Sequence, residues 1–254
     1  QNAQPALMAT SLAAMRALEA EGVAITDASY VAGHSLGEYS ALAAAGSLSI
    51  ADAARLLRIR GRAMQEAVPV GVGAMAALLG LDFDAARAVA EEAAQGEVCQ
   101  AANDNDPAQV VVSGHKAAVE RAVEIAKAKG AKRALPLPVS VPSHCELMRP
   151  AAERFAESIA AIDWQAPQIP LVQNVSASVV SDVGTLKTDL LQQLYKPVRW
   201  VESIQALAAN GALQLVECGP GKVLAGLNKR CADGVNTYNL NTPDAFAAAR
   251  AALV

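Results

Sequence analysis

One short pattern in the sequence has the residue types and spacing of an activated nucleophile: Gly33-His34-Ser35-Leu36-Gly37. It lies between a strand-like stretch at 29–32 and a helix-like stretch at 38–45. In this setting the two glycines permit a tight turn that exposes the Ser35 hydroxyl, and the Leu36 N–H lies at a helix N-terminus, where it can stabilise an oxyanion. The alternative is a glycine-rich turn with Ser35 as an ordinary helix cap. The strand before it and the helix after it favour the nucleophile.

An activated serine needs a base, and the sequence offers three histidines for that role. His34 lies inside the turn beside the nucleophile, where a packing role is favoured. His115 begins a helix in the middle of the chain, which is typical of a capping or surface residue. His144 lies in a proline-fixed loop just before a helix, so the fold can bring it to Ser35, and we expect it to be the base. Cys145 is a rival nucleophile. It does not lie in a strand–turn–helix elbow like that of Ser35, however, and is predicted to be a small buried thiol.

No carboxylate occupies the position that a hydrolase requires. In α/β-hydrolases the acid precedes the histidine in the chain. The candidate aspartates between Ser35 and His144 are Asp82, Asp84, Asp104 and Asp106, which fall in a predicted small domain, whereas Asp52 lies in the first turn of an earlier predicted helix. We therefore expect a Ser–His pair whose imidazole is oriented by a carbonyl group, and we nominate no aspartate.

A helix is predicted over residues 49–67, with Ser49 as its cap and Asp52 three residues on. It places one arginine among apolar side chains. At 100° per residue, Arg60 shares a stripe with Leu56, Leu57, Ala63 and Met64. A buried guanidinium must be paired, and its planar fork matches a carboxylate. Two partners remain open for Arg60: a protein acid such as Glu38, or a carboxylate on the substrate.

Two further polar segments are weaker candidates. Residues 103–107 read Asn-Asp-Asn-Asp-Pro, which predicts a polar loop between strands; such loops usually only connect elements, although at a cleft rim they can bind ligands. Gln193 comes near the end of a predicted helix, before Pro197, where a surface or capping residue is usual. By themselves these residues predict no chemistry.

The elements that must position these residues alternate between helix and strand, which predicts an α/β fold with a mostly parallel sheet covered on both faces. Between Pro69 and Pro138 the order becomes β-α-β-β-α-β, the ferredoxin-like split pattern. We therefore predict an inserted small domain at residues 70–138 and a large domain formed by residues 1–69 and 139–254.

Composition excludes several classes of function. The chain has 254 residues, and its 21 lysines and arginines against 25 aspartates and glutamates give a formal charge of −4. The basic residues are dispersed, which argues against nucleic-acid binding. The most apolar uncharged stretch, 67–81, is too short and too rich in glycine and proline to span a membrane. Four cysteines without a C-x-x-C pair argue against a zinc site or a disulfide framework and favour a cytoplasmic location. We expect no metal and no cofactor.

Five blocks of the sequence together resemble the malonyl-CoA:acyl carrier protein transacylases of bacterial fatty acid synthesis. The blocks are Gly33–Leu42, Arg60–Gln65, Val139–Cys145, Gln193–Val198 and Glu217–Leu224. They follow one another with the spacing of the family and cover essentially the whole chain. The G-x-S-x-G pattern alone would not carry this resemblance, but the five blocks together do.

The resemblance implies a hydrolase-like large domain with an inserted ferredoxin-like small domain. It implies that Ser35 takes the malonyl group from malonyl-CoA as an ester and passes it to the phosphopantetheine thiol of acyl carrier protein. In both steps His144 moves the proton, first as base and then as acid.

The resemblance also gives roles to four further residues. Gln193 matches the residue whose main chain orients the histidine, and Arg60 matches the arginine that holds the malonyl carboxylate, which favours the substrate as its partner. Asn103 and Asn105 match a family loop near the substrate entrance.

Other functions compatible with these residues stay open. The chain could be the acyltransferase domain of a polyketide synthase, a serine esterase or thioesterase that shares the elbow, or a binding fragment without activity. We expect a monomer, and because the carrier protein is acidic we expect a basic patch near residues 127–133. The family begins with a strand and a Gly-Gln-Gly-Ser-Gln loop that supplies a second oxyanion donor. This sequence begins in a helix-like stretch, so we expect it to be incomplete.

Overall fold

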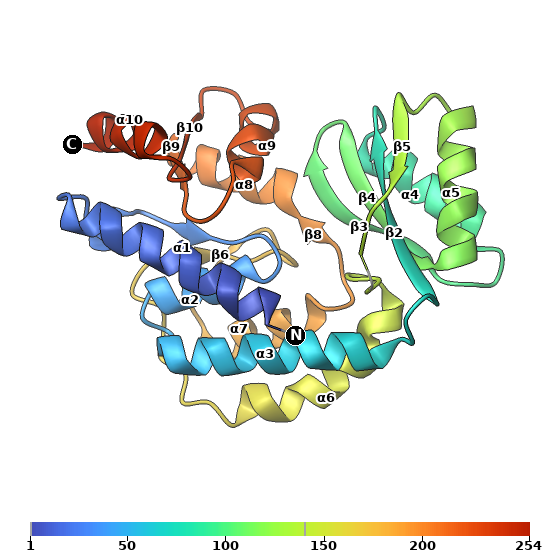
Figure 1. Ribbon diagram of the computed structural model, residues 1–254, viewed down its shortest axis with the longest axis horizontal. Helices are drawn as coiled ribbons and strands as arrows, with labels where there is room; N and C mark the ends of the chain where they lie inside the picture. The colour runs from blue at the N-terminus through green and yellow to red at the C-terminus, as the bar shows by residue number, and fades with distance from the viewer. Residues whose placement is uncertain (1, 140) are drawn as a thin grey trace. The chain divides into compact units, whose positions relative to one another are not determined.

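The computed structural model describes residues 2–139 and 141–254 and shows a mixed α/β protein (Figure 1). The chain forms two compact units, which we name after Ser35 and His144. The serine unit comprises the chain up to Arg58, Ile162–Leu186 and Glu202–Val254. The histidine unit comprises Ile59–Ala161 and Lys187–Val201, and so contains the whole of the predicted small domain. The boundaries of that domain at residues 70 and 138 stay a prediction.

The histidine unit is built on the β-α-β-β-α-β order that the sequence predicts. Its elements are β2 (Gly73–Leu79), α4 (Phe83–Ala94), β3 (Cys99–Asp106), β4 (Gln109–His115), α5 (Lys116–Ala128) and β5 (Arg133–Pro136). The strands lie in the antiparallel order β5-β2-β4-β3, with α4 and α5 packed against the sheet (Figure 1). The core between them contains the buried side chains of Ala86, Val89, Val112 and Ala122. Small residues let the helices approach the sheet closely, so a core with few aromatic residues can still be dense.

Strand β3 is longer and more polar than expected. Residues 103–106, which the sequence predicts as a loop, form its second half, where Asn103 pairs with Val111 of β4. On its other side, Asn103 pairs in parallel with Val198 of β8 (Val198–Arg199), a strand that the sequence does not predict. Pairing on both sides outweighs the low strand propensity of Asn and Asp. The loop expected for this segment is therefore wrong.

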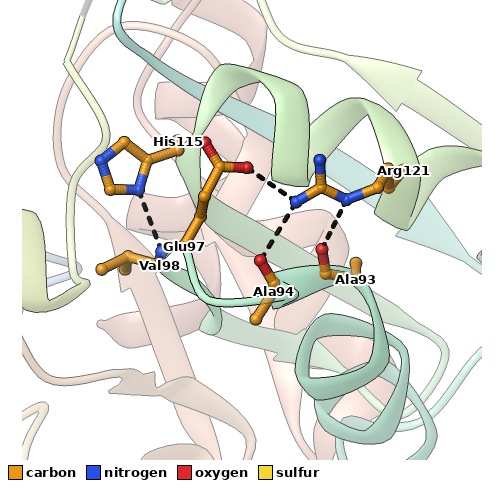
Figure 2. Close-up of polar contacts among 6 residues, drawn as sticks. All are labelled: Ala93, Ala94, Glu97, Val98, His115 and Arg121. Atoms are coloured by element: carbon orange, nitrogen blue, oxygen red, sulfur yellow. Dashed lines mark hydrogen bonds and ion pairs between the residues drawn. The ribbon is translucent and has the colours of Figure 1, made fainter.

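An arginine links α4 and α5 of the histidine unit (Figure 2). Arg121 of α5 donates from Nε to Ala93 O at 2.8 Å and from Nη2 to Ala94 O at 3.0 Å. The last carbonyl groups of a helix lack partners within the helix, and a cation at this end also complements the helix dipole. The same guanidinium lies 2.7 Å from the Glu97 carboxylate. Arg121 thus caps α4 from the neighbouring helix.

The serine unit contains two small sheets with the parallel pairing predicted for the large domain. In the first, β1 (Val31–Ala32) pairs in parallel with β6 (Leu171–Val172), which pairs antiparallel with β7 (Val179–Val180). In the second, β9 (Gln214–Glu217) and β10 (Asn236–Asn239) are parallel. Helix α1 (Ala3–Ala20) packs against α2 (Gly37–Ala44), the helix that follows the serine motif.

The remaining elements are helices and helical turns. They are η1 (Ile25–Asp27), α3 (Ile50–Ala67), η2 (Glu146–Met148), α6 (Arg149–Ala160), α7 (Val183–Gln192), α8 (Trp200–Ala209), α9 (Val223–Cys231) and α10 (Pro243–Leu253). Helix α3 begins at the predicted cap, where the Asp52 N–H donates to Ser49 Oγ at 3.0 Å. Among residues 2–139 and 141–254, no helix is long and apolar enough to cross a membrane.

Candidate functional site

The serine unit holds Ser35 in a strained turn between β1 and α2. Its backbone φ is 53°, in the left-handed region that costs a residue with a Cβ roughly 1–2 kcal/mol. The Gly37 N–H donates to His34 O at 2.9 Å, and the Glu38 N–H donates to Ser35 O at 3.1 Å. Only glycine fits at position 33, because a Cβ there would lie 1.9 Å from the Gly37 carbonyl carbon. These features are typical of a nucleophile elbow.

Leu36 follows Ser35 as the N-cap residue of α2. Within the two described stretches of the chain, its N–H donates to no acceptor. N–H groups at a helix N-terminus carry the positive end of the helix dipole. The Leu36 N–H can therefore donate to an oxygen atom held next to Ser35, and its role as the oxyanion donor stays a prediction.

Asn174 joins both sides of the elbow, although no local pattern in the sequence indicates it. Its Oδ1 accepts a hydrogen bond from the Ser35 N–H, and its Nδ2 donates to Gly33 O, both at 2.7 Å. Its own backbone N–H donates to Glu38 Oε1, also at 2.7 Å. Asn174 is 1% exposed and Glu38 is 0% exposed. In such a shielded place, the loss of one hydrogen-bond partner costs about 1–3 kcal/mol.

Asn174 could be identified from the sequence only together with the pairing of two strands. The residue comes just after β6, and β6 pairs in parallel with β1, the strand that leads into the elbow. The carboxyl ends of parallel strands lie at the same edge of a sheet, where sites form in open α/β folds. A polar residue directly after the neighbouring strand is therefore a candidate to contact the elbow.

The histidine unit holds His144 by two main-chain contacts. His144 is 3% exposed and has a φ of 61°. Its backbone N–H donates to Leu194 O at 3.0 Å, and its Nδ1 lies 2.6 Å from Gln193 O. Since a carbonyl oxygen can only accept, Nδ1 carries the proton in this contact and Nε2 of the neutral ring is unprotonated. This is the tautomer that a general base requires.

Arg60 lies in the same unit, on α3, and is 1% exposed. The apolar stripe predicted around it is buried as well: Leu56, Leu57, Ala63 and Met64. Arg60 Nη2 donates to Gln193 Oε1 at 3.0 Å. Gln193 therefore contacts His144 with its main chain and Arg60 with its side chain. Glu38, one of the two partners considered for Arg60, belongs to the serine unit and accepts from Asn174.

Cys145, the rival nucleophile, is fully buried. Its thiol donates to Pro142 O at 3.3 Å, and Ser113 Oγ lies 3.6 Å from its sulfur. Burial raises the pKa of the Cys145 thiol to about 11. Because the thiolate is the nucleophile, a thiol with this pKa is unreactive near neutral pH.

The two other histidines differ in their surroundings. His34 is half-buried within the elbow itself. His115 is the N-cap residue of α5 but makes no capping bond; its Nδ1 accepts from the Val98 N–H at 2.9 Å (Figure 2). The His115 backbone N–H donates to Val98 O at 2.8 Å. His115 therefore joins the start of α5 to the loop before β3, so the capping or surface role expected for it gives way to a structural one.

Asn103 and Asn105 lie in β3, where Asn103 is 6% exposed and Asn105 is half-buried. Their expected position in a loop is wrong, and their contact with substrate stays a prediction. In the part of the chain that the structure describes, no group of three or more His, Cys, Asp or Glu residues is arranged to hold a metal ion.

The basic residues expected to attract an acidic partner are partly neutralised. Lys127 lies 2.9 Å from the Glu124 carboxylate, and Lys129 is paired with Glu92. A basic patch at residues 127–133 is thus weaker than the sequence suggests, and it stays a prediction.

The predicted residues divide between the units. The serine unit holds Ser35 and the Leu36 N–H, whereas the histidine unit brings together His144, Gln193 and Arg60 and also carries Asn103 and Asn105.

Comparisons with known proteins give a consistent result. A model of the acyl transferase domain matches residues 1–241. The malonyl CoA-acyl carrier protein transacylase of Escherichia coli K12 is 51% identical over 97% of this chain and 79% of its own length. The crystal structure of an acyl-carrier-protein S-malonyltransferase from Burkholderia pseudomallei is similar with a TM-score of 0.95 and 50% identity, covering 98% of this chain and 81% of that one. A malonyl-transacylase in complex with a type II PKS acyl-carrier protein is similar with a TM-score of 0.94 and 45% identity, covering 98% of this chain and 80% of that one.

Proposed function

The chain belongs to the acyl transferase domain family and, within it, to the malonyl CoA-acyl carrier protein transacylases, and from this premise we propose how its residues carry the reaction. The activity is transfer of a malonyl group from malonyl-CoA to the phosphopantetheine thiol of acyl carrier protein in fatty acid synthesis. The two substrates use the same site in turn, with a malonyl-serine ester between them.

In the first half-reaction, Ser35 Oγ attacks the thioester carbonyl of malonyl-CoA while His144 Nε2 takes the hydroxyl proton. The carbonyl oxygen becomes an oxyanion, to which the Leu36 N–H donates. When the tetrahedral intermediate collapses, the C–S bond breaks and the protonated His144 gives its proton to the sulfur of coenzyme A. The products are coenzyme A and malonyl-Ser35.

In the second half-reaction, the steps run in reverse with a new thiol. The phosphopantetheine thiol of the carrier protein gives its proton to His144 and attacks the ester carbonyl. The C–O bond to Ser35 then breaks, and His144 returns the proton to Ser35 Oγ. The Gln193 main-chain oxygen keeps Nδ1 protonated throughout and stabilises the imidazolium, which is the part an aspartate plays in a triad.

Arg60 is the proposed binding residue for the malonyl carboxylate. A guanidinium offers a planar pair of N–H donors that matches a carboxylate in both charge and geometry. The contact with Gln193 Oε1 orients the guanidinium. Asn103 and Asn105 are proposed to lie near the substrate path, on the strength of the family resemblance alone.

The geometry at Ser35 is the observation that carries this proposal. A serine with a φ of 53°, between a strand and a helix and followed by a helix N-terminal N–H, has no purely structural reason to accept the strain. Ser35→Ala should lower transfer by at least about four orders of magnitude, as for other triad nucleophiles. Ser40→Ala, which changes a serine on α2 outside the elbow, is the matched control. Equal losses of transfer activity in the two variants would reject Ser35 as the nucleophile.

A serine esterase would use the same elbow, but it would transfer the acyl group to water rather than to a thiol. The acceptor therefore distinguishes the two functions. A transferase consumes malonyl-CoA rapidly only when a carrier thiol is present. Rapid release of free malonate in water without a thiol would favour the esterase.

We also propose that residues 70–138 form the inserted small domain and that the protein is located in the cytoplasm. Four free cysteines support the location, because thiols persist in reducing compartments.

A further inference from the structure

We propose that Asn174 is a positioning residue that holds Ser35 in its reactive conformation. The inference rests on the proposed role of Ser35 as the nucleophile. It assigns to Asn174 no contact with substrate; the residue acts through the backbone of the elbow.

Ser35 needs an external support because its conformation is unfavourable for a residue with a Cβ. A φ of 53° persists only where the surroundings determine it. The hydrogen bonds within the turn hold Gly37 and Glu38. The support that reaches the Ser35 N–H comes from Asn174, 139 residues away in the sequence.

The amide of Asn174 is suited to this task because it carries a donor and an acceptor on one planar group. Its Oδ1 accepts from the Ser35 N–H while its Nδ2 donates to Gly33 O, so the two bonds bracket His34 on both sides. Both bonds measure 2.7 Å. Rotation of the Ser35 backbone away from the left-handed region would break the first bond and leave a buried oxygen without its donor.

The backbone of Asn174 links the same residue to the helix after the elbow. Its N–H donates to the carboxylate of Glu38, in the first turn of α2. Asn174 therefore bonds before, at and after the nucleophile. Because the Ser35 N–H is directed to Asn174, the next N–H, that of Leu36, is the donor left for an oxyanion.

The test separates positioning from a general loss of structure. Asn174→Ala removes both side-chain bonds. Gln173→Ala is the matched control, since Gln173 is 0% exposed, precedes Asn174 and donates from Nε2 to Leu186 O rather than to the elbow. Each variant is mixed with malonyl-CoA in a single turnover, and the malonyl adduct is followed by intact-protein mass spectrometry and mapped to its residue.

Positioning and folding affect different parts of this time course. If Asn174 positions Ser35, the Asn174→Ala variant should still reach one adduct per chain on Ser35, with a rate constant lower by about 100-fold, the cost expected for a small misplacement of a reacting group. Gln173→Ala should label at the wild-type rate. If Asn174→Ala instead gives fewer labelled chains at the wild-type rate, Asn174 only supports folding and the proposal is overturned.

A second variant tests the hydrogen-bond pattern itself. Asn174→Asp keeps the acceptor for Ser35 but places a carboxylate oxygen against Gly33 O. Protonation of that carboxyl group restores the donor, so the rate relative to wild type should rise as the pH falls, whereas the ratio for Asn174→Ala should stay constant. Parallel profiles for the two variants would contradict the proposal. An adduct mapped to a residue other than Ser35 in the wild type would instead reject the proposed function, and this inference with it.

Discussion

Ser35 and His144 lie in different units, yet the structure holds them in the same unusual way. Both are non-glycine residues in the left-handed region, with φ values of 53° and 61°. Both direct the backbone N–H to a partner far away in the sequence: Ser35 to Asn174, and His144 to Leu194. The serine is held by a side-chain amide, however, whereas the histidine is held by main-chain oxygens.

This difference determines which of the two supports a substitution can remove. A side-chain support can be removed by substitution, but a main-chain carbonyl remains whatever side chain it carries. We therefore expect the orientation of Ser35 to depend strongly on residue 174. The orientation of His144 should depend little on the side chain at position 193.

After loss of the Ser35 nucleophile itself, the largest effect should come from removing the base. His144→Ala should lower the rate of Ser35 acylation by about 10²–10⁴-fold, the usual contribution of general acid–base catalysis. His115→Ala serves as a control, because His115 contacts Val98 in the loop before β3 of the same unit; it should lower the melting temperature and leave the acylation rate of folded protein unchanged. Quench-flow labelling measures the rates, and a His144→Ala variant within 10-fold of wild type would remove His144 from the mechanism.

The next effect should be on substrate choice. An acetyl donor offers no carboxylate to the buried Arg60 guanidinium; loss of one member of a buried charge pair costs about 3–5 kcal/mol, which corresponds to a preference for malonyl of at least about 100-fold. Arg60→Ala should abolish most of that preference when the two donors compete for labelling. Arg62, exposed on the same helix and paired with Glu66, is the matched control. An unchanged malonyl-to-acetyl ratio would contradict the role of Arg60.

A smaller loss of acylation rate is expected from substitution of Gln193. It tests directly whether the main-chain support of His144 differs from the side-chain support of Ser35. Gln193→Ala keeps the main-chain oxygen that contacts Nδ1 of His144 and removes the side-chain bond to Arg60. Loss of one hydrogen bond costs about 0.5–1.5 kcal/mol, so acylation should fall by no more than about 10-fold. If Gln193→Ala lowered the acylation rate more than Asn174→Ala does, the supports of Ser35 and His144 would not differ as proposed.

The smallest effect should appear at a left-handed residue outside the proposed site. Gln95 is the exposed C-cap residue of α4, with a φ of 47°. Gln95→Gly should stabilise the fold by about 1 kcal/mol because glycine carries no penalty in this region. That corresponds to a rise in melting temperature of about 2–4 °C, with no change in acylation. A lower melting temperature would mean that strain at such positions is not relieved by glycine.

The fold of each unit was largely predictable because its signals are local. The predicted order of strands and helices between residues 73 and 136 matches the observed elements, and the Ser49 cap starts α3. The exceptions are β7 and β8, the latter with its partner, the second half of β3. Two residues at 198–199 carry no periodicity, and 103–106 have the composition of a loop; pairing of β3 with β4 on one side and with 198–199 on the other makes them strand.

The residues of the site divide in the same way, between those with local sequence signals and those whose contacts are long-range. Ser35 and Arg60 were identified by local patterns, an elbow and a helical stripe. Asn174 was missed because its importance comes from the parallel pairing of β6 with β1, which a single sequence does not specify. Gln193 was assigned through the family resemblance, since a main-chain contact leaves no trace in the type of side chain.

The position of the covalent adduct tests the central claim most directly. Wild-type protein would be mixed with malonyl-CoA without an acceptor, quenched, digested and mapped by mass spectrometry, and a second sample would receive carrier protein before the quench. The account predicts one malonyl group per chain on the peptide containing Ser35, and its loss to the carrier in the second sample. An adduct on Cys145, or transfer to the carrier without any adduct, would contradict it.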